Sequence, residues 1–97
     1  MHTAFIKYQA AAASNVVVAT GKAILHRILI GADITSGDIQ VADHPSDATV
    51  NVKIKKTGST LMTANSGVID VGAVFTNGIV CTLTNQTQVT FIWEPVA

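Results

Sequence analysis

The chain has 97 residues, of which 48% are hydrophobic and only 12% are charged, with six basic residues balanced by six acidic ones. This length fits one domain, and the balance excludes the strongly basic surface of a nucleic-acid-binding protein. Charged residues usually make up about 25% of a soluble domain. We therefore expect a surface that is polar through Thr, Ser, Asn and Gln, or one that protein partners partly cover.

Cysteine content and hydropathy exclude two further classes. The only cysteine, Cys81, cannot form an intrachain disulfide, which fits folding in a reducing cytoplasm. A membrane-spanning helix needs about 20 mostly apolar residues, and the longest candidate, residues 10–19, is interrupted by Ser14 and Asn15. We also expect no signal peptide. The prediction is a single domain over residues 1–97, with residues 1–14 as a candidate N-terminal arm.

Short β-strand patterns recur along the chain and are separated by turn residues. The expected strands cover residues 4–10, 15–20, 22–30, 38–42, 49–55, 60–63, 68–75, 79–83 and 87–93, with an alanine-rich link joining the first two runs. The four alanines at 10–13 are too few to hold a helix alone, so this link is expected to be coil or a kinked strand. About eight short strands without a strong helix predict an all-β domain, either an antiparallel β-sandwich or a jelly roll.

Side-chain alternation separates expected core residues from surface residues. In residues 22–30 both alternating faces are mostly apolar, which predicts a central strand covered on two sides. In residues 49–55 the alternation is regular and is expected to point three side chains inward, Val50, Val52 and Ile54.

Four residues of the last two strands are also expected inside. Val89, Phe91 and Trp93 alternate along one face of the last strand. Cys81 shares its face with Ile79 and Leu83, so we expect a buried, unreactive thiol.

Two turn signals are clearer than the others. The run Asp43-His44-Pro45-Ser46-Asp47 combines a proline that fixes φ with side chains that bind their own backbone. Asn77-Gly78 stands between two apolar runs, which is the strongest short hairpin signal. It predicts a type I′ turn that pairs residues 71–75 with residues 79–83. Gly72 is expected to mark a bulge or a close backbone approach.

The sequence contains no set of residues that predicts catalysis. It has no GxSxG motif, no recognisable Ser, His and Asp spacing, and no glycine-rich phosphate loop. His26 lies in an apolar strand and is expected to be packed or hydrogen-bonded. Asp70 is expected on the solvent face or at an interface. We therefore expect neither enzymatic activity nor a cofactor.

Two short segments carry residue types that bind metals, but neither predicts a site. Asp43, His44 and Asp47 share one turn, and no second ligand cluster accompanies them. The other segment lacks the closing glutamate of a calcium loop and holds Asp33, Thr35 and Asp38. Turns capped by Asp explain both segments better, so no metal is expected.

Lysines and aromatic residues suggest two further interpretations. The one basic cluster, Lys53, Lys55 and Lys56, fits an edge strand on which lysines discourage pairing with other sheets, and a phosphate-binding patch is the alternative. A carbohydrate-binding module is a rival function, because β-sandwiches often host one. Such sites use exposed aromatic rings, but aromatic residues make up only 5% of the chain, and Tyr8 is the one we expect to be exposed.

Four segments between residues 24 and 93 resemble a recurring pattern in small virion proteins of tailed bacteriophages. They are Leu25-His26-Arg27-Ile28-Leu29-Ile30-Gly31, Gly37-Asp38-Ile39-Gln40-Val41-Ala42-Asp43, Val68-Ile69-Asp70-Val71-Gly72-Ala73-Val74-Phe75-Thr76-Asn77-Gly78-Ile79 and Val89-Thr90-Phe91-Ile92-Trp93. The matches are strand-and-turn phrases and carry no chemical signature. The resemblance implies a head decoration (cement) protein, or another minor structural component of the head or tail.

The resemblance also implies partners and a location. They are the major capsid protein or another virion protein, self-association that includes a trimer, and the outer surface of the capsid after synthesis in the host cytoplasm. The first residues are apolar and nearly uncharged, which motivates the expectation that they contact a capsid subunit or add a strand to its sheet. The candidate partner-binding residues are His2, Thr3, Phe5, Ile6 and Tyr8. The alternative is that this segment is simply the first core strand.

Overall fold

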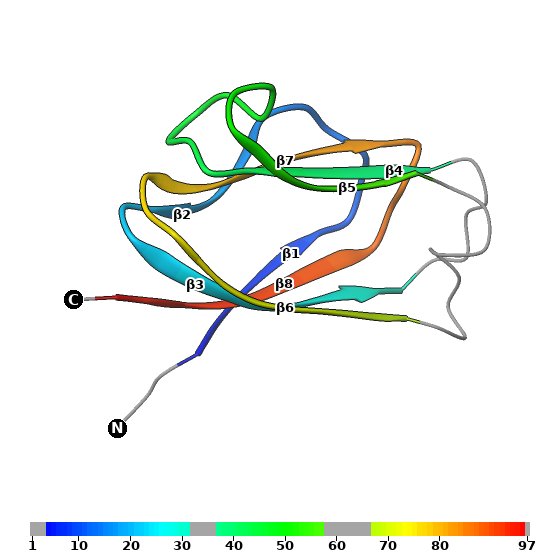
Figure 1. Cartoon of the computed structure of the whole chain (residues 1–97). Helices are drawn as coiled ribbons and strands as arrows, with labels where there is room; N and C mark the ends of the chain where they lie inside the picture. Colours follow the sequence, from blue (N-terminus) through cyan, green and yellow to red (C-terminus); the bar gives the residue numbers. More distant parts are fainter. Residues whose placement is uncertain (1–3, 32–36, 58–66, 97) are drawn as a thin grey trace.

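The computed structural model describes residues 4–31, 37–57 and 67–96, which form two four-stranded antiparallel sheets (Figure 1). The first sheet has the order β1 (Phe5–Gln9), β8 (Val89–Pro95), β3 (Ala23–Ile30) and β6 (Val68–Phe75). The second sheet has the order β2 (Val16–Thr20), β7 (Gly78–Thr84), β4 (Asp38–Ala42) and β5 (Val52–Thr57). The predicted all-β sandwich is confirmed.

The pairing of the strands defines the sandwich as a jelly roll. Four of the strand pairs together form one long antiparallel hairpin whose tip lies between β4 and β5. They are β1·β8, β2·β7, β3·β6 and β4·β5. Two further pairs, β3·β8 and β4·β7, close this hairpin into two sheets. Rolling a long hairpin in this way produces the eight-stranded jelly roll.

The core lies between the sheets and consists of the inward side chains of six strands. Its largest fully buried apolar side chains are Phe75, Phe91, Leu25, Ile28, Ile39 and Ile79. Burying a side chain of this size contributes about 1.5–3 kcal/mol, so these six residues make a large favourable contribution to folding. No residue of β1 belongs to the buried core.

The hairpin predicted at Asn77-Gly78 is wrong. β6 belongs to the first sheet and β7 to the second, so the chain crosses between the sheets at this point. The carboxylate of Asp43, which is buried, accepts hydrogen bonds from the backbone N–H groups of Thr76 (3.0 Å) and Asn77 (2.7 Å). These bonds satisfy the backbone where the two strands separate, and they come from a residue more than 30 positions away in the chain.

Residues 22–30 form an interior strand of the first sheet, as predicted, but the prediction that both faces of this strand are covered is wrong. A β-bulge between Leu25 and Arg27 changes which alternate residues face the core. Before the bulge Ala23 and Leu25 are buried, and after it Ile28 and Ile30 are buried. The strand therefore covers the core with one face, and its apolar residues on the other face lie at the surface.

Gly72 lies in the same irregularity, on the neighbouring strand. Two residues, Val71 and Gly72, stand opposite the single residue His26. Gly72 has φ +60, a left-handed conformation that glycine adopts without steric cost. The bulge expected at this position is confirmed.

The segment between β4 and β5 folds back over the outer face of the second sheet (Figure 1). Ala48 is fully buried there with Ala42 and Val80. The carbonyl oxygen of Ala48 accepts a hydrogen bond from the Gln40 amide (2.7 Å), and its N–H donates to the Asn15 side chain (2.9 Å). The chain thus covers part of this outer face itself.

The inward orientation predicted for Val50 and Val52 is wrong. Val50 precedes β5, and a register shift between Val52 and Ile54 interrupts the alternation at the start of the strand. Val50 is 45% exposed and Val52 is 40% exposed. Ile54 is half-buried against the core, as predicted. Asn51, at φ 57, changes the chain direction just before the strand, which the alternating pattern does not reveal.

Other sequence expectations are confirmed. Residues 43–47 form a turn in which His44 Nδ1 accepts hydrogen bonds from the N–H groups of Ser46 (3.1 Å) and Asp47 (2.9 Å). Cys81 is fully buried. Three expectations lie outside the described residues: the strand at 60–63, the loop ligands Asp33 and Thr35, and the partner-binding residues His2 and Thr3.

Candidate interaction surface

Each sheet ends in two edge strands, whose outer backbone groups have no neighbouring strand. Proteins usually protect such edges with charged residues or β-bulges, because an unprotected edge pairs with other chains. Three of the four edges in the described structure have a register shift or a β-bulge. β2 has a register shift between Val17 and Ala19, β6 has the bulge at Gly72, and β5 has both a register shift and lysines.

The edge role predicted for the lysine cluster is confirmed. Lys53, Lys55 and Lys56 all lie on β5, the outermost strand of the second sheet. Lys53 sits where the register against β4 shifts, between the pairs that Val52 and Ile54 form.

β1 is the one edge among the described strands that combines an unbroken register with an outer sheet face that carries no charge. Its five residues pair with β8 in unbroken register, from Phe5 opposite Trp93 to Gln9 opposite Val89. Three large apolar side chains are exposed on it: Phe5 at 42%, Ile6 at 69% and Tyr8 at 54%. The single charge, Lys7, lies opposite the buried Phe91 and so on the inner side of the sheet, and such an inward charge gives this edge some protection. β1 therefore presents a regular, apolar edge that a further strand can join.

Phe5 and Trp93 fix the start of β1 on β8. Their rings meet edge to face, with centroids 5.0 Å apart and an angle of 69° between the planes. Such pairs contribute about 0.5–1.5 kcal/mol beyond area burial. Trp93 is half-buried at the margin of the core, whereas Val89 and Phe91 are fully buried. The predicted inner face of the last strand is thus confirmed, with Trp93 at its border.

The outer face of the first sheet is the second candidate surface, and its side chains form three rows across the strands. The first row contains Tyr8, Thr90, Leu29 and Val68, and the middle row contains Ile6, Ile92, Arg27 and Asp70. The third row contains Glu94, Ile24 and Val74. Four of these side chains are large, apolar and at least half exposed, namely Ile6, Tyr8, Val68 and Val74.

Charged groups lie in the middle of this outer sheet face. Arg27 Nε lies 3.4 Å from Asp70 Oδ1, and the two side chains are 60% and 83% exposed. His26 Nε2 lies 2.6 Å from Glu94 Oε1, so His26 is hydrogen-bonded, as predicted. Asp70 lies on the solvent face, also as predicted. On this face, the Arg27 guanidinium and the His26 imidazole therefore each have a carboxylate beside them.

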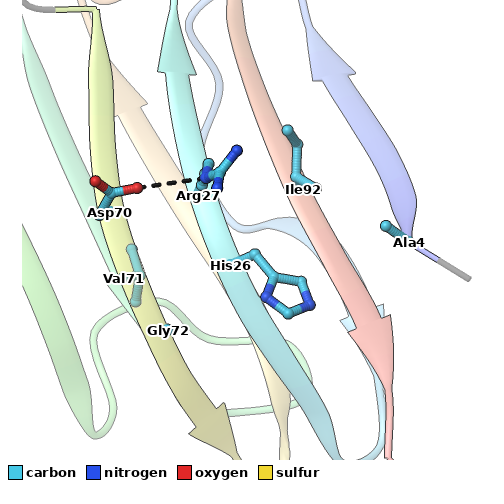
Figure 2. A pocket seen from close by; sticks show the side chains of 7 residues that line it. All are labelled: Ala4, His26, Arg27, Asp70, Val71, Gly72 and Ile92. Carbon is cyan, nitrogen blue, oxygen red and sulfur yellow. Dashed lines mark ion pairs between the residues drawn. The ribbon is translucent and has the colours of Figure 1, made fainter. Parts of the chain in front are cut away.

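A shallow hollow of about 450 Å³ crosses the sheet beside these groups (Figure 2). Figure 2 shows the Arg27–Asp70 ion pair at one side, His26 in front and Ile92 on the next strand. A Cβ atom added at Gly72 would meet no atom within 4 Å, so the bulge leaves open space. The hollow is broad and open, which suits contact with another surface better than enclosure of a small molecule.

Within the described ranges, no three His, Cys, Asp or Glu residues gather in a geometry that could hold a metal ion. Asp43, which the sequence grouped with His44 and Asp47 as candidate metal ligands, instead accepts backbone N–H hydrogen bonds with both carboxylate oxygens. Asp47 likewise accepts hydrogen bonds from Thr49, and these bonds lower the pKa of its carboxyl group.

Comparisons of the chain with protein-family models, with curated proteins and with solved structures found no match. Among the residues that the structure describes, no helix is long and apolar enough to cross a membrane.

Proposed function

We propose that this protein is a head decoration protein of a tailed bacteriophage, which binds and stabilises the lattice of the major capsid protein. The observation that carries the proposal is the regular, mostly apolar edge of β1, which contains three of the residues that the sequence suggested for partner binding: Phe5, Ile6 and Tyr8. The resemblance to small phage virion proteins supports the kind of partner. The jelly roll adds support only by analogy, since this fold recurs in viral capsid domains but also serves other functions.

Strand addition at β1 is the proposed mode of binding. An extended segment of a capsid subunit would pair with the outer backbone groups of β1 and would bury the exposed side chains beside it. Burial of apolar area contributes about 25 cal/mol per Å² before the cost of association is subtracted. Each contact contributes little binding free energy by itself. Many copies on one lattice, including copies that associate with one another, are held on the capsid more firmly than a single copy.

Pelleting with emptied heads of the phage that encodes the chain tests this function. We expect the wild-type protein to sediment with the heads in a saturable way. Ile6→Lys and Tyr8→Lys place on β1 the charge that protects β5, and each should weaken binding at least tenfold. The matched control is Val17→Lys on the β2 edge, where Val17 is 40% exposed, and it should bind as the wild type does.

A protein that does not sediment with heads would overturn the proposal. The rival functions are a tail-associated component and a carbohydrate-binding module. Binding to isolated tails, or to a glycan array at physiological salt, would identify one of them. Tyr8 is the exposed ring that would serve a glycan, while Phe91 is buried and Trp93 is half-buried.

A further inference from the structure

Lys7 is the one charged residue of β1, and it lies on the inner side of the first sheet. It stands opposite the fully buried Phe91 and is itself half-buried, whereas its neighbours Ile6 and Tyr8, on the outer side, are exposed. Burial raises the pKa of the Cys81 thiol in the second sheet, and the Lys7 ammonium is close enough to oppose this shift. Lys7 therefore places its charge between the two sheets, beside the free edge of β1.

The Lys7 ammonium has no counterion within the part of the chain that the structure describes. It takes part in no hydrogen bond or ion pair with the described residues. The carboxylate of the neighbouring strand β8, Glu94, instead meets His26 on the outer face of the sheet. A charge that is partly removed from water costs free energy unless an opposite charge or hydrogen bonds compensate it. A carboxylate supplied by another chain would compensate this one.

A strand added to β1 would bring one residue directly opposite Lys7. Side chains of a strand alternate between the two sides of a sheet, so this residue would lie on the inner side, with its Cβ atom about 4.5–5.5 Å from that of Lys7 in an antiparallel pair. An apolar residue there would remove water from the ammonium without replacing it. The two flanking residues would lie on the outer side, beside Ile6 and Tyr8, where large apolar side chains bury the most area.

We propose that β1 preferentially binds an extended segment with an aspartate or glutamate opposite Lys7 and large apolar residues at the two flanking positions. The inference rests on the proposed function and names the chemistry of the capsid segment. The inward charge protects the edge from unrelated apolar strands and favours this one, because specificity often comes from penalising the wrong partner. The β1 strand of a second copy does not meet the requirement, since it carries no carboxylate.

Short synthetic peptides that alternate valine and threonine test this preference. The central threonine is replaced by glutamate, glutamine or lysine, and NMR titration of the full chain follows the amide signals of residues 5–9. The wild-type protein should bind the glutamate peptide about tenfold more tightly than the lysine peptide, with the glutamine peptide between them. Equal affinities for the three peptides, or no binding of any of them, would overturn the inference.

Substitutions at position 7 show whether Lys7 causes the preference. Lys7→Glu should reverse it in favour of the lysine peptide. Lys7→Gln should bind all three peptides about equally, and it keeps the test valid if the reversed charge lowers stability; thermal melting curves establish that each variant folds. The matched control is Lys53→Glu on β5, which changes the net charge as much as Lys7→Glu does and should keep the wild-type preference. A control that loses the preference would assign it to net charge and contradict a direct pair with Lys7.

Pelleting with emptied heads separates this inference from the proposed function. Lys7→Glu should bind the heads about tenfold more weakly than Lys53→Glu does. Equal binding of these two variants would overturn the acidic partner and leave the decoration function standing. Wild-type protein that prefers the glutamate peptide but ignores heads would instead overturn only the proposed function.

Discussion

Asp43 is the residue on which the connection between the sheets depends most directly. It is 6% exposed, and its two carboxylate oxygens accept hydrogen bonds from consecutive backbone N–H groups between β6 and β7. The sequence places Asp43 in the turn over residues 43–47. Nothing in this local pattern shows that its side chain also binds the backbone of Thr76, 33 residues further along the chain. Such a contact depends on the tertiary fold, so the sequence could not have predicted it.

Replacing Asp43 with alanine should lower the free energy of unfolding by about 3 kcal/mol, because two backbone N–H groups lose their charged acceptor. Asp43→Asn keeps one acceptor oxygen and should cost less. Urea unfolding followed by Trp93 fluorescence measures both losses. Equal stability of the Asp43→Ala variant and the wild type would show that these hydrogen bonds do not support the crossing.

Cys81 confirms the prediction of a buried, unreactive thiol. Burial raises the pKa of this thiol from its ordinary value of 9.0 to about 12, and the nearby Lys7 ammonium opposes the shift. Between these two values the unfolded chain loses the proton while the folded chain keeps it. The free energy of unfolding should therefore fall as the pH rises above about 9.

Parallel urea titrations of the wild type and Cys81→Ala between pH 8 and pH 11 isolate this effect. The variant keeps every other titrating group, so its stability should fall less steeply with pH. Its lower stability at all pH values, caused by the lost packing, does not affect the comparison of slopes. Identical slopes would contradict a raised thiol pKa.

At the scale of elements, alternation and turn residues identified most strands but not all of their connections. The Asn77-Gly78 signal correctly marked a change of direction, yet it could not distinguish a hairpin within one sheet from a crossing between two sheets. Residues 22–30 were correctly assigned to a strand, but a bulge reversed the alternation of their side chains within it. Neither the sheet to which a strand belongs nor a change of register is encoded in a local pattern.

The outer sheet face was missed for the same reason. A regular alternation along β3 assigns its outer apolar residues to a second buried face. Once the bulge at His26 and Gly72 is included, Arg27 takes an outward position level with Ile92 and Asp70. The candidate residues of β1 were easier to propose, since they form an apolar, nearly uncharged run, and the structure shows that Phe5, Ile6 and Tyr8 are exposed.

The bulge predicts that Gly72→Ala destabilises the protein by about 1 kcal/mol. A methyl group meets no atom there, so the cost comes from the left-handed backbone conformation alone. Gly72→Asn should cost less, because Asn adopts this conformation more readily than Ala does. Thermal unfolding of the two variants measures the difference, and an Asn variant less stable than the Ala variant would argue against this origin.

At the scale of the molecule, the jelly roll places the proposed binding edge, β1, outside the buried core. The buried core comes from strands other than β1, while β1 pairs with β8 alone and exposes three of its large side chains. The eight-stranded class followed from the sequence, whereas the order of strands did not, because it depends on how the long hairpin rolls.

Removal of residues 1–12 should therefore leave a folded sandwich that no longer binds heads. β8 would become an edge strand, so some loss of stability is expected without loss of the core. Circular dichroism establishes the fold and pelleting with emptied heads establishes binding. An unfolded deletion variant would show that β1 acts as a necessary strand of the domain.

Hydrogen–deuterium exchange of the wild-type protein, free and bound to emptied heads, tests the central claim most directly. Strand addition gives the outer N–H groups of β1 new acceptors, so the peptide covering residues 4–10 should exchange more slowly on the heads. The β5 peptide, residues 52–57, should exchange at the same rate in both states. Unchanged exchange in residues 4–10, or protection confined to β5, would contradict binding through the β1 edge.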